Sequence, residues 1–176
     1  EQKDDWSFRR SKWFSAIEKE CKNVRENVGL LDMTAFAKCR IKGPGAEAFL
    51  DKLVANKLPK KIGRINLCHA LNTKGGVHSE FTIMRESETS FYLVSAGAFQ
   101  RLDHDWILKW MPNDGSVQFE NLTNSNGVLV VAGPKARELM QKVSKDDFSN
   151  ENFKWLSSKM VDVGYAPVNA MRVNFV

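Results

Sequence analysis

The chain has 176 residues, 43% of them hydrophobic, so it can bury one substantial core and is far from the composition of a disordered protein. Its formal charge of +5 arises from 26 Lys and Arg residues interleaved with 21 acidic residues, whereas a nucleic-acid-binding protein concentrates its cations on one face. No apolar stretch reaches the roughly 20 residues of a membrane-spanning helix, and no signal peptide is evident. We therefore expect a soluble globular protein that binds neither nucleic acid nor membrane.

The cysteines and histidines predict neither a disulfide framework nor a metal site. Cys21, Cys39 and Cys68 are odd in number and lack a C-x-x-C spacing, and the three histidines fall on different predicted elements. A reducing compartment fits this pattern best. We expect the cytoplasm, or the mitochondrial matrix if the source is a eukaryote.

Both ends of the sequence look cut. It begins with Glu1 rather than Met, and it stops at Val176 inside an apolar run. We expect a fragment of a longer protein, in which residues 1–11 form an N-terminal arm and residues 12–176 form one domain that is incomplete at its C-terminal end.

Periodicity predicts an α+β domain whose first half covers about residues 12–111. Apolar residues spaced by three and four indicate helices, and alternating residues indicate half-buried strands. The elements expected are helices at 13–28, 46–56 and 99–110, and strands at 37–42, 64–71, 77–84 and 91–95. Gly75 and Gly76 permit the positive φ of a tight turn, so the strands on either side of them form an antiparallel pair.

The second half, from about residue 112, contains short strand signals near Val117, at 128–131, at 160–163 and at 168–175. A strand, Gly-Pro and helix unit at residues 40–50 recurs ninety residues later, at residues 130–140. Two such units also arise by chance in α+β chains. The matched apolar spacing favours an internal duplication.

Glu80 is the titratable residue with the most suggestive surroundings. Alternation along the strand places it on one face with His78, Thr82 and Met84. Partly apolar neighbours disfavour the charged form of a carboxylate, which makes Glu80 a candidate to handle a proton or to pair with a cationic amine. The alternative is a solvated strand face, because many strands have one wet side.

Other chemistry receives less support from the sequence. A Cys/His nucleophilic pair would need a proximity that the sequence does not indicate, and the glycines are too few for a phosphate-binding loop. Trp106 and Trp110 fit helix packing. Trp155, in an irregular stretch, is the better candidate to stack on a flat heterocycle.

Several segments resemble, in order, signature steps of the glycine-cleavage T-protein (aminomethyltransferase) folate-binding domain. They include an arginine, a glycine and a hydrophobic-Asp-hydrophobic-Thr step within 24–34, the Gly-Pro step at 41–46, the Asn-Thr-Lys-Gly-Gly step at 71–77 and a second Gly-Pro step at 132–136. Residues 8–14 and 56–59 look more like the folate domain of dimethylglycine or sarcosine dehydrogenase than like a free-standing T-protein.

This resemblance implies a fold of two duplicated, swapped β-α-β subdomains around a folate cavity. It implies tetrahydrofolate as cofactor, with transfer of a one-carbon unit from an aminomethyl donor or an N-methylated amine to give methylenetetrahydrofolate. FAD would belong to a separate flavin domain of the full-length protein, which this chain does not contain.

The resemblance also assigns site residues. The functional acid of the family aligns with Glu80, while Thr82, Ser95, Trp155 and Phe175 align with folate-binding positions. Leu67 stands where T-proteins often have a tyrosine. Two functions therefore remain open, a one-carbon transferase domain and a non-catalytic folate-binding or scaffold module of a larger oxidoreductase.

Overall fold

The computed structural model describes residues 8–173, which form antiparallel β-sheets flanked by helices. The helices are α1 (Phe14–Glu26), α2 (Ala46–Leu53), the 3-10 helix η1 (Gly97–Phe99), α3 (Gln100–Trp110) and α4 (Ala136–Val143). The strands are β1 (Gly29–Asp32), β2 (Ala37–Lys42), β3 (Ile65–Leu71), β4 (Val77–Ser87), β5 (Ser90–Ser95), β6 (Gln118–Asn121), β7 (Leu129–Ala132), β8 (Ser157–Val163) and β9 (Ala166–Arg172). None of the helices described is long and apolar enough to cross a membrane.

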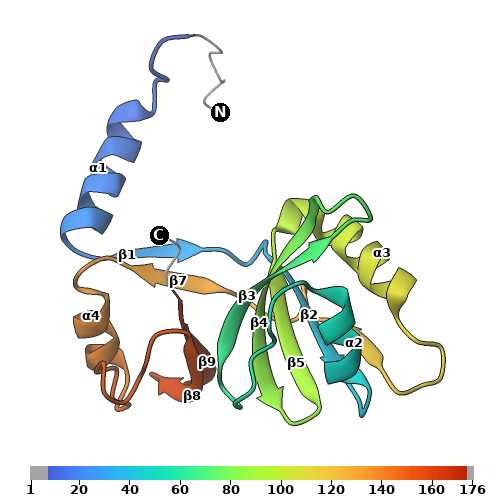
Figure 1. Ribbon diagram of the computed structural model, residues 1–176. Helices are drawn as coiled ribbons and strands as arrows, with labels where there is room; N and C mark the ends of the chain where they lie inside the picture. Colours follow the sequence, from blue (N-terminus) through green and yellow to red (C-terminus); the bar gives the residue numbers. More distant parts are fainter. Residues whose placement is uncertain (1–7, 174–176) are drawn as a thin grey trace.

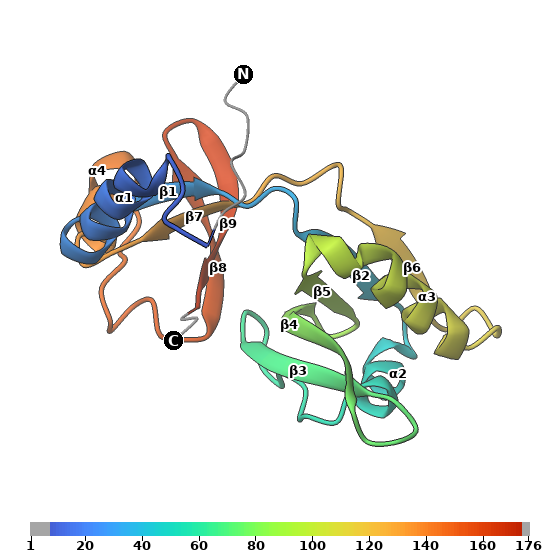
Figure 2. The ribbon, with the colours of Figure 1, turned by 90° about the horizontal axis from the view of Figure 1, so that it is seen from above.

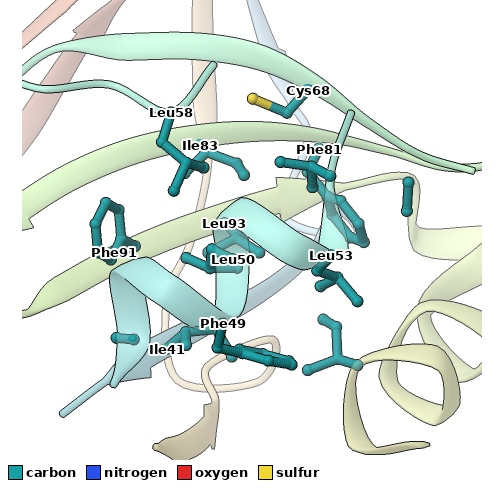
Figure 3. Close-up of a cluster of buried hydrophobic side chains, with 14 of the residues drawn as sticks. Ile41, Phe49, Leu50, Leu53, Leu58, Cys68, Phe81, Ile83, Phe91 and Leu93 are labelled. Carbon is teal, nitrogen blue, oxygen red and sulfur yellow. The ribbon is translucent and has the colours of Figure 1, made fainter. Parts of the chain in front are cut away.

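The largest sheet has five strands in the order β3-β4-β5-β2-β6. Helix α2 packs its apolar side against one face of this sheet (Figure 3). Ile107 of α3 belongs to the same core. Side chains at the centre of this core are Ile41, Phe49, Leu50, Leu53, Phe81, Ile83, Phe91 and Leu93, all less than 9% exposed. Alternation along β4 correctly placed Phe81 and Ile83 on one face, and this face is buried.

The two halves of the chain exchange strands. β1, from the first half, pairs antiparallel with β7, and β6, from the second half, pairs antiparallel with β2 at the edge of the five-stranded sheet. The two connections, β1 to β2 and β6 to β7, run side by side between the sheets (Figures 1 and 2). This exchange is the swapped arrangement that the resemblance implied.

The backbone confirms the internal duplication. Gly43 and Gly133 have φ values of 123° and 119°, a region that favours glycine. After each of them the chain makes the same hydrogen bonds. The amides of Ala46 and Ala136 donate to the carbonyls of Gly43 and Gly133, both at 3.0 Å. The amides of residues 45 and 135 donate to the carbonyls of residues 116 and 27, which lie just before β6 and β1 respectively.

The hairpin β8–β9 covers the second face of the five-stranded sheet. Ile65, Met84 and Tyr92 from the sheet form a cluster with Leu122, against which Leu156, Met171 and Val173 pack. A third cluster, built on Phe148, Phe153 and Val161, joins this hairpin to α4. The sheet is thus buried on both faces over part of its length.

Strand β1 was not predicted from the residue pattern. Leu30 and Leu31 are 64% and 42% exposed, and the only partner of β1 in the described chain is β7, about one hundred residues away. A four-residue strand with exposed side chains shows no alternation of burial. Its pairing partner alone defines it.

Candidate functional site

A pocket of about 390 Å³ opens where β4 runs past the end of β5. Its polar lining residues are His78, Ser79, Glu80, Thr82, Ser95 and Asp103. Its apolar lining residues are Phe36, Val77, Val94, Ala96 and Phe99. The lining therefore combines apolar walls with a few polar groups, which is the usual character of a small-molecule site.

Glu80 lines this pocket with a side chain that is largely exposed to solvent. Its side chain is 61% exposed, and its Oε2 lies 3.0 Å from Nε2 of His69, the residue directly opposite on β3. The imidazole of His69 is 30% exposed. The carboxylate is thus neither a buried group nor a free surface charge, because a histidine from the neighbouring strand holds it.

His78 departs from the predicted alternation. Ala70 pairs with Ser79, whereas Leu71 pairs with Val77, so a β-bulge leaves His78 without a partner across the strands. Its ring stacks on Trp106 of α3 at 4.0 Å between ring centroids, and its Nδ1 lies 2.9 Å from the Ser79 hydroxyl. The bulge therefore directs His78 toward α3.

Thr82 and Ser95 line the same pocket from two neighbouring strands. Thr82 lies opposite Val94 of β5, and Ser95 follows Val94 at the end of that strand. The Ser95 hydroxyl donates a hydrogen bond of 2.6 Å to Oδ2 of Asp103, in the first turn of α3. The structure thus brings three of the five predicted site residues, Glu80, Thr82 and Ser95, to one cavity.

Trp155 does not line this pocket. It precedes β8, it is 53% exposed, and its carbonyl accepts a hydrogen bond from Arg64. Phe175 lies outside the described residues. The proposed roles of these two residues in folate binding stay predictions.

Asp103 and His69 were not predicted as site residues. Asp103 is only 3% exposed, although it belongs to an amphipathic helix whose polar residues were expected to face water. His69 meets Glu80 only because of the exact register of β3 on β4. The position of Asp103 in the first turn of the helix after β5 was the available signal for a site residue. By itself this signal is weak, because acidic residues are common in the first turn of helices.

Lys38 holds the turn that contains Phe36, one of the residues that line the pocket. It is fully buried, and its Nζ donates to the carbonyls of Thr34 and Phe36 at 2.7 and 2.8 Å. Burial lowers the pKa of this amine, and the nearby charge of Asp32 opposes that shift. Because Phe36 lines the pocket, Lys38 fixes the turn that leads into β2.

The cavity presents two carboxylates, Glu80 and Asp103, and no Lys or Arg is found among the described residues that line it. Carboxylates and hydroxyl groups in apolar walls can accept hydrogen bonds from a nitrogen heterocycle, stabilise a cationic amine or move a proton. The lining thus suits a small ligand that carries hydrogen-bond donors.

Comparison with known proteins places this geometry in a family. The family model described as the GCVT N-terminal domain matches residues 3–176. Mitochondrial dimethylglycine dehydrogenase of Homo sapiens is 38% identical over 170 residues, which cover 96% of this chain and 20% of that protein. The mitochondrial pyruvate dehydrogenase phosphatase regulatory subunit of Mus musculus is 31% identical over 169 residues, or 95% of this chain and 19% of that protein.

The chain therefore spans about a fifth of the length of these relatives. Among solved structures, the glycine cleavage system aminomethyltransferase T from Bartonella henselae superposes with a TM-score of 0.70 at 21% identity, over 80% of this chain and 37% of that one. This likeness shows a shared fold. With a family model that covers nearly every residue, the chain belongs to the GCVT N-terminal domain family.

Proposed function

We propose that this chain is the folate-binding part of a one-carbon transferase that produces methylenetetrahydrofolate. The observation that carries the proposal is the convergence of Glu80, Thr82 and Ser95 on one pocket in a member of this family. The relationship to dimethylglycine dehydrogenase supports a longer flavoprotein that oxidises an N-methylated amine. A T-protein homologue that takes an aminomethyl donor is the second form of the same proposal.

Glu80 is the candidate catalytic carboxylate. When bound, tetrahydrofolate supplies the nitrogen atoms that accept the carbon unit. The Glu80 carboxylate can stabilise positive charge on an incoming amine and accept a proton from it. His69 Nε2, 3.0 Å away, can take that proton from Glu80 in the neutral tautomer whose hydrogen is on Nδ1.

The walls of the pocket orient the ligand. Phe36 and Phe99 offer aromatic surfaces on which a flat ring can stack, and Thr82 and the end of β5 supply polar contacts at its edge. Thr82 lies within β4, Phe99 lies in η1, and Lys38 holds the carbonyl of Phe36, so these elements position the groups before a ligand arrives.

Calorimetric titration with 5-formyltetrahydrofolate tests the proposal. We expect saturable binding to the chain and about tenfold weaker binding to Glu80→Gln, because a hydrogen bond to a charged group contributes roughly 1.5 kcal/mol or more. Glu88→Gln, a matched change at an exposed turn residue of the same sheet, should bind as the unmodified protein does. Absence of saturable heat from a folded version of the protein extended past Val176 would rule out the folate assignment.

A non-catalytic module is the second candidate function. One relative is named as a regulatory subunit, and the similarity to it covers 95% of this chain. A scaffold of this kind needs no carboxylate in the pocket. Equal folate affinities of the Glu80→Gln and Glu88→Gln proteins would therefore favour the module over the transferase.

A further inference from the structure

Asp103 is a buried carboxylate in the wall of the pocket. The residue is 3% exposed, yet it lines the cavity together with Glu80, whose side chain is 61% exposed. The Ser95 hydroxyl donates to Asp103 Oδ2 at 2.6 Å. The Asp103 carboxylate has lone pairs beyond the one that accepts from Ser95, and the cavity is where a ligand could provide donors for them.

The hydrogen bond from Ser95 also decides what the serine can offer to a ligand. A serine hydroxyl has one hydrogen, and this hydrogen points to Asp103, so the lone pairs of Oγ remain for the cavity. Glu80 and Asp103 are acceptors when ionised, and none of the lining residues that the structure describes is Lys or Arg. The pocket thus presents negative charge and hydrogen-bond acceptors.

We propose that Asp103 is a second ligand-binding carboxylate of this pocket, and that it makes the pocket select a nitrogen group bearing N–H hydrogens over an anionic group. The inference rests on the proposed function, because it concerns the same site. Two candidate ligands carry such a nitrogen group: the amino-substituted pteridine ring and the cationic amine of the one-carbon donor. An anionic part of either ligand, such as the glutamate tail of a folate, then lies outside the pocket.

Variants of α3 test the proposal. Asp103→Asn removes the buried charge with little change in shape, whereas Asp105→Asn makes the same change at a side chain that is 71% exposed on the same helix. Each protein is titrated with 5-formyltetrahydrofolate and with dimethylammonium chloride. We expect Asp103→Asn to weaken at least one of these ligands about tenfold or more and Asp105→Asn to weaken neither.

The two titrations distinguish the sources. Weaker folate binding alone assigns Asp103 to the ring, and weaker dimethylammonium binding alone assigns it to the amine. Unchanged affinity for both ligands overturns the proposal. If no variant binds folate but dimethylammonium binding depends on Asp103, the proposed function fails and the selectivity of the pocket stands.

A measurement on the unmodified chain covers the case in which Asp103→Asn does not fold. Amide resonances of Ser79, Thr82 and Ser95 are followed by NMR during addition of dimethylammonium chloride or of sodium acetate. We expect saturable shifts with the cation and none with the anion. Equal shifts with acetate would contradict the proposal, whatever the variants do.

Discussion

His104 lies between two aspartates on α3, and its ring contacts Phe119 of β6 edge-on, at 5.0 Å between ring centroids. Burial lowers the pKa of its imidazole below the ordinary value of 6.5, and the charges of Asp103 and Asp105 oppose the shift only in part. Between the folded and unfolded pKa values the unfolded chain binds more protons. The free energy of unfolding therefore rises as the pH rises through this window, and protonation of His104 destabilises the fold.

The direction of this pH dependence gives a prediction for His104. Lowering the pH from 7.5 to 5.5 should reduce the free energy of unfolding of the unmodified chain more than that of His104→Gln, as measured by urea denaturation. Four carboxylates have lowered pKa values: Asp32, Asp114, Glu120 and Asp147. The stability that they contribute is lost only at more acidic pH, below this window. The same pH dependence in both proteins would exclude His104 as the cause.

At the scale of the elements, each of the two Gly-Pro junctions connects a strand to the helix that follows it. A Cβ at Gly43 would lie 2.3 Å from the carbonyl oxygen of Ser116, and a Cβ at Gly133 would lie 2.5 Å from that of Asn27. In each junction the glycine thus allows the exchanged strand from the other half of the chain to approach closely. The duplication therefore conserves a contact as well as a conformation.

A matched pair of glycine substitutions tests this role. Gly43→Ala combines a positive φ with a backbone clash and should lower the free energy of unfolding by more than about 2 kcal/mol. Gly164→Ala has a positive φ of 61° but nothing within 4 Å of the added Cβ, so it should cost about 1 kcal/mol. Chemical denaturation of both variants measures the difference, and equal costs would show that the approach of Ser116 is unimportant.

On the scale of the whole molecule, strand exchange makes each half depend on the other. β7 has β1 as its pairing partner in the described chain, while the five-stranded sheet takes only β6 from the second half. A chain that starts at residue 34 lacks β1 but keeps every strand of the larger sheet. Loss of β1 should therefore disturb the second half more than the first.

Hydrogen exchange tests this dependence. In the chain that starts at residue 34, amides of β7 should exchange at least tenfold faster, while those of β4 and β5 keep their protection. A chain that starts at residue 12 retains β1 and serves as the control. Unchanged protection of β7 in the shorter chain would mean that contacts other than pairing with β1 hold this strand in place.

The sequence by itself determined the local elements, the duplication and three members of the pocket. Spacings of three and four predicted α2 and α3, and alternation predicted β2 as a half-buried strand and the two faces of β4, because these periods follow directly from backbone geometry. Alignment with a known family pointed to Glu80, Thr82 and Ser95. Local pattern and resemblance were enough to predict features that a single helix or strand determines.

Only the tertiary structure decided which elements meet. The pairing of β1 with β7, the contact of His69 with Glu80 and the burial of Asp103 against Ser95 each join residues whose local sequence shows nothing unusual. Trp155 is not among the residues that line the pocket. Such contacts depend on register and on which surfaces exclude water together, and these are properties of the folded chain as a whole.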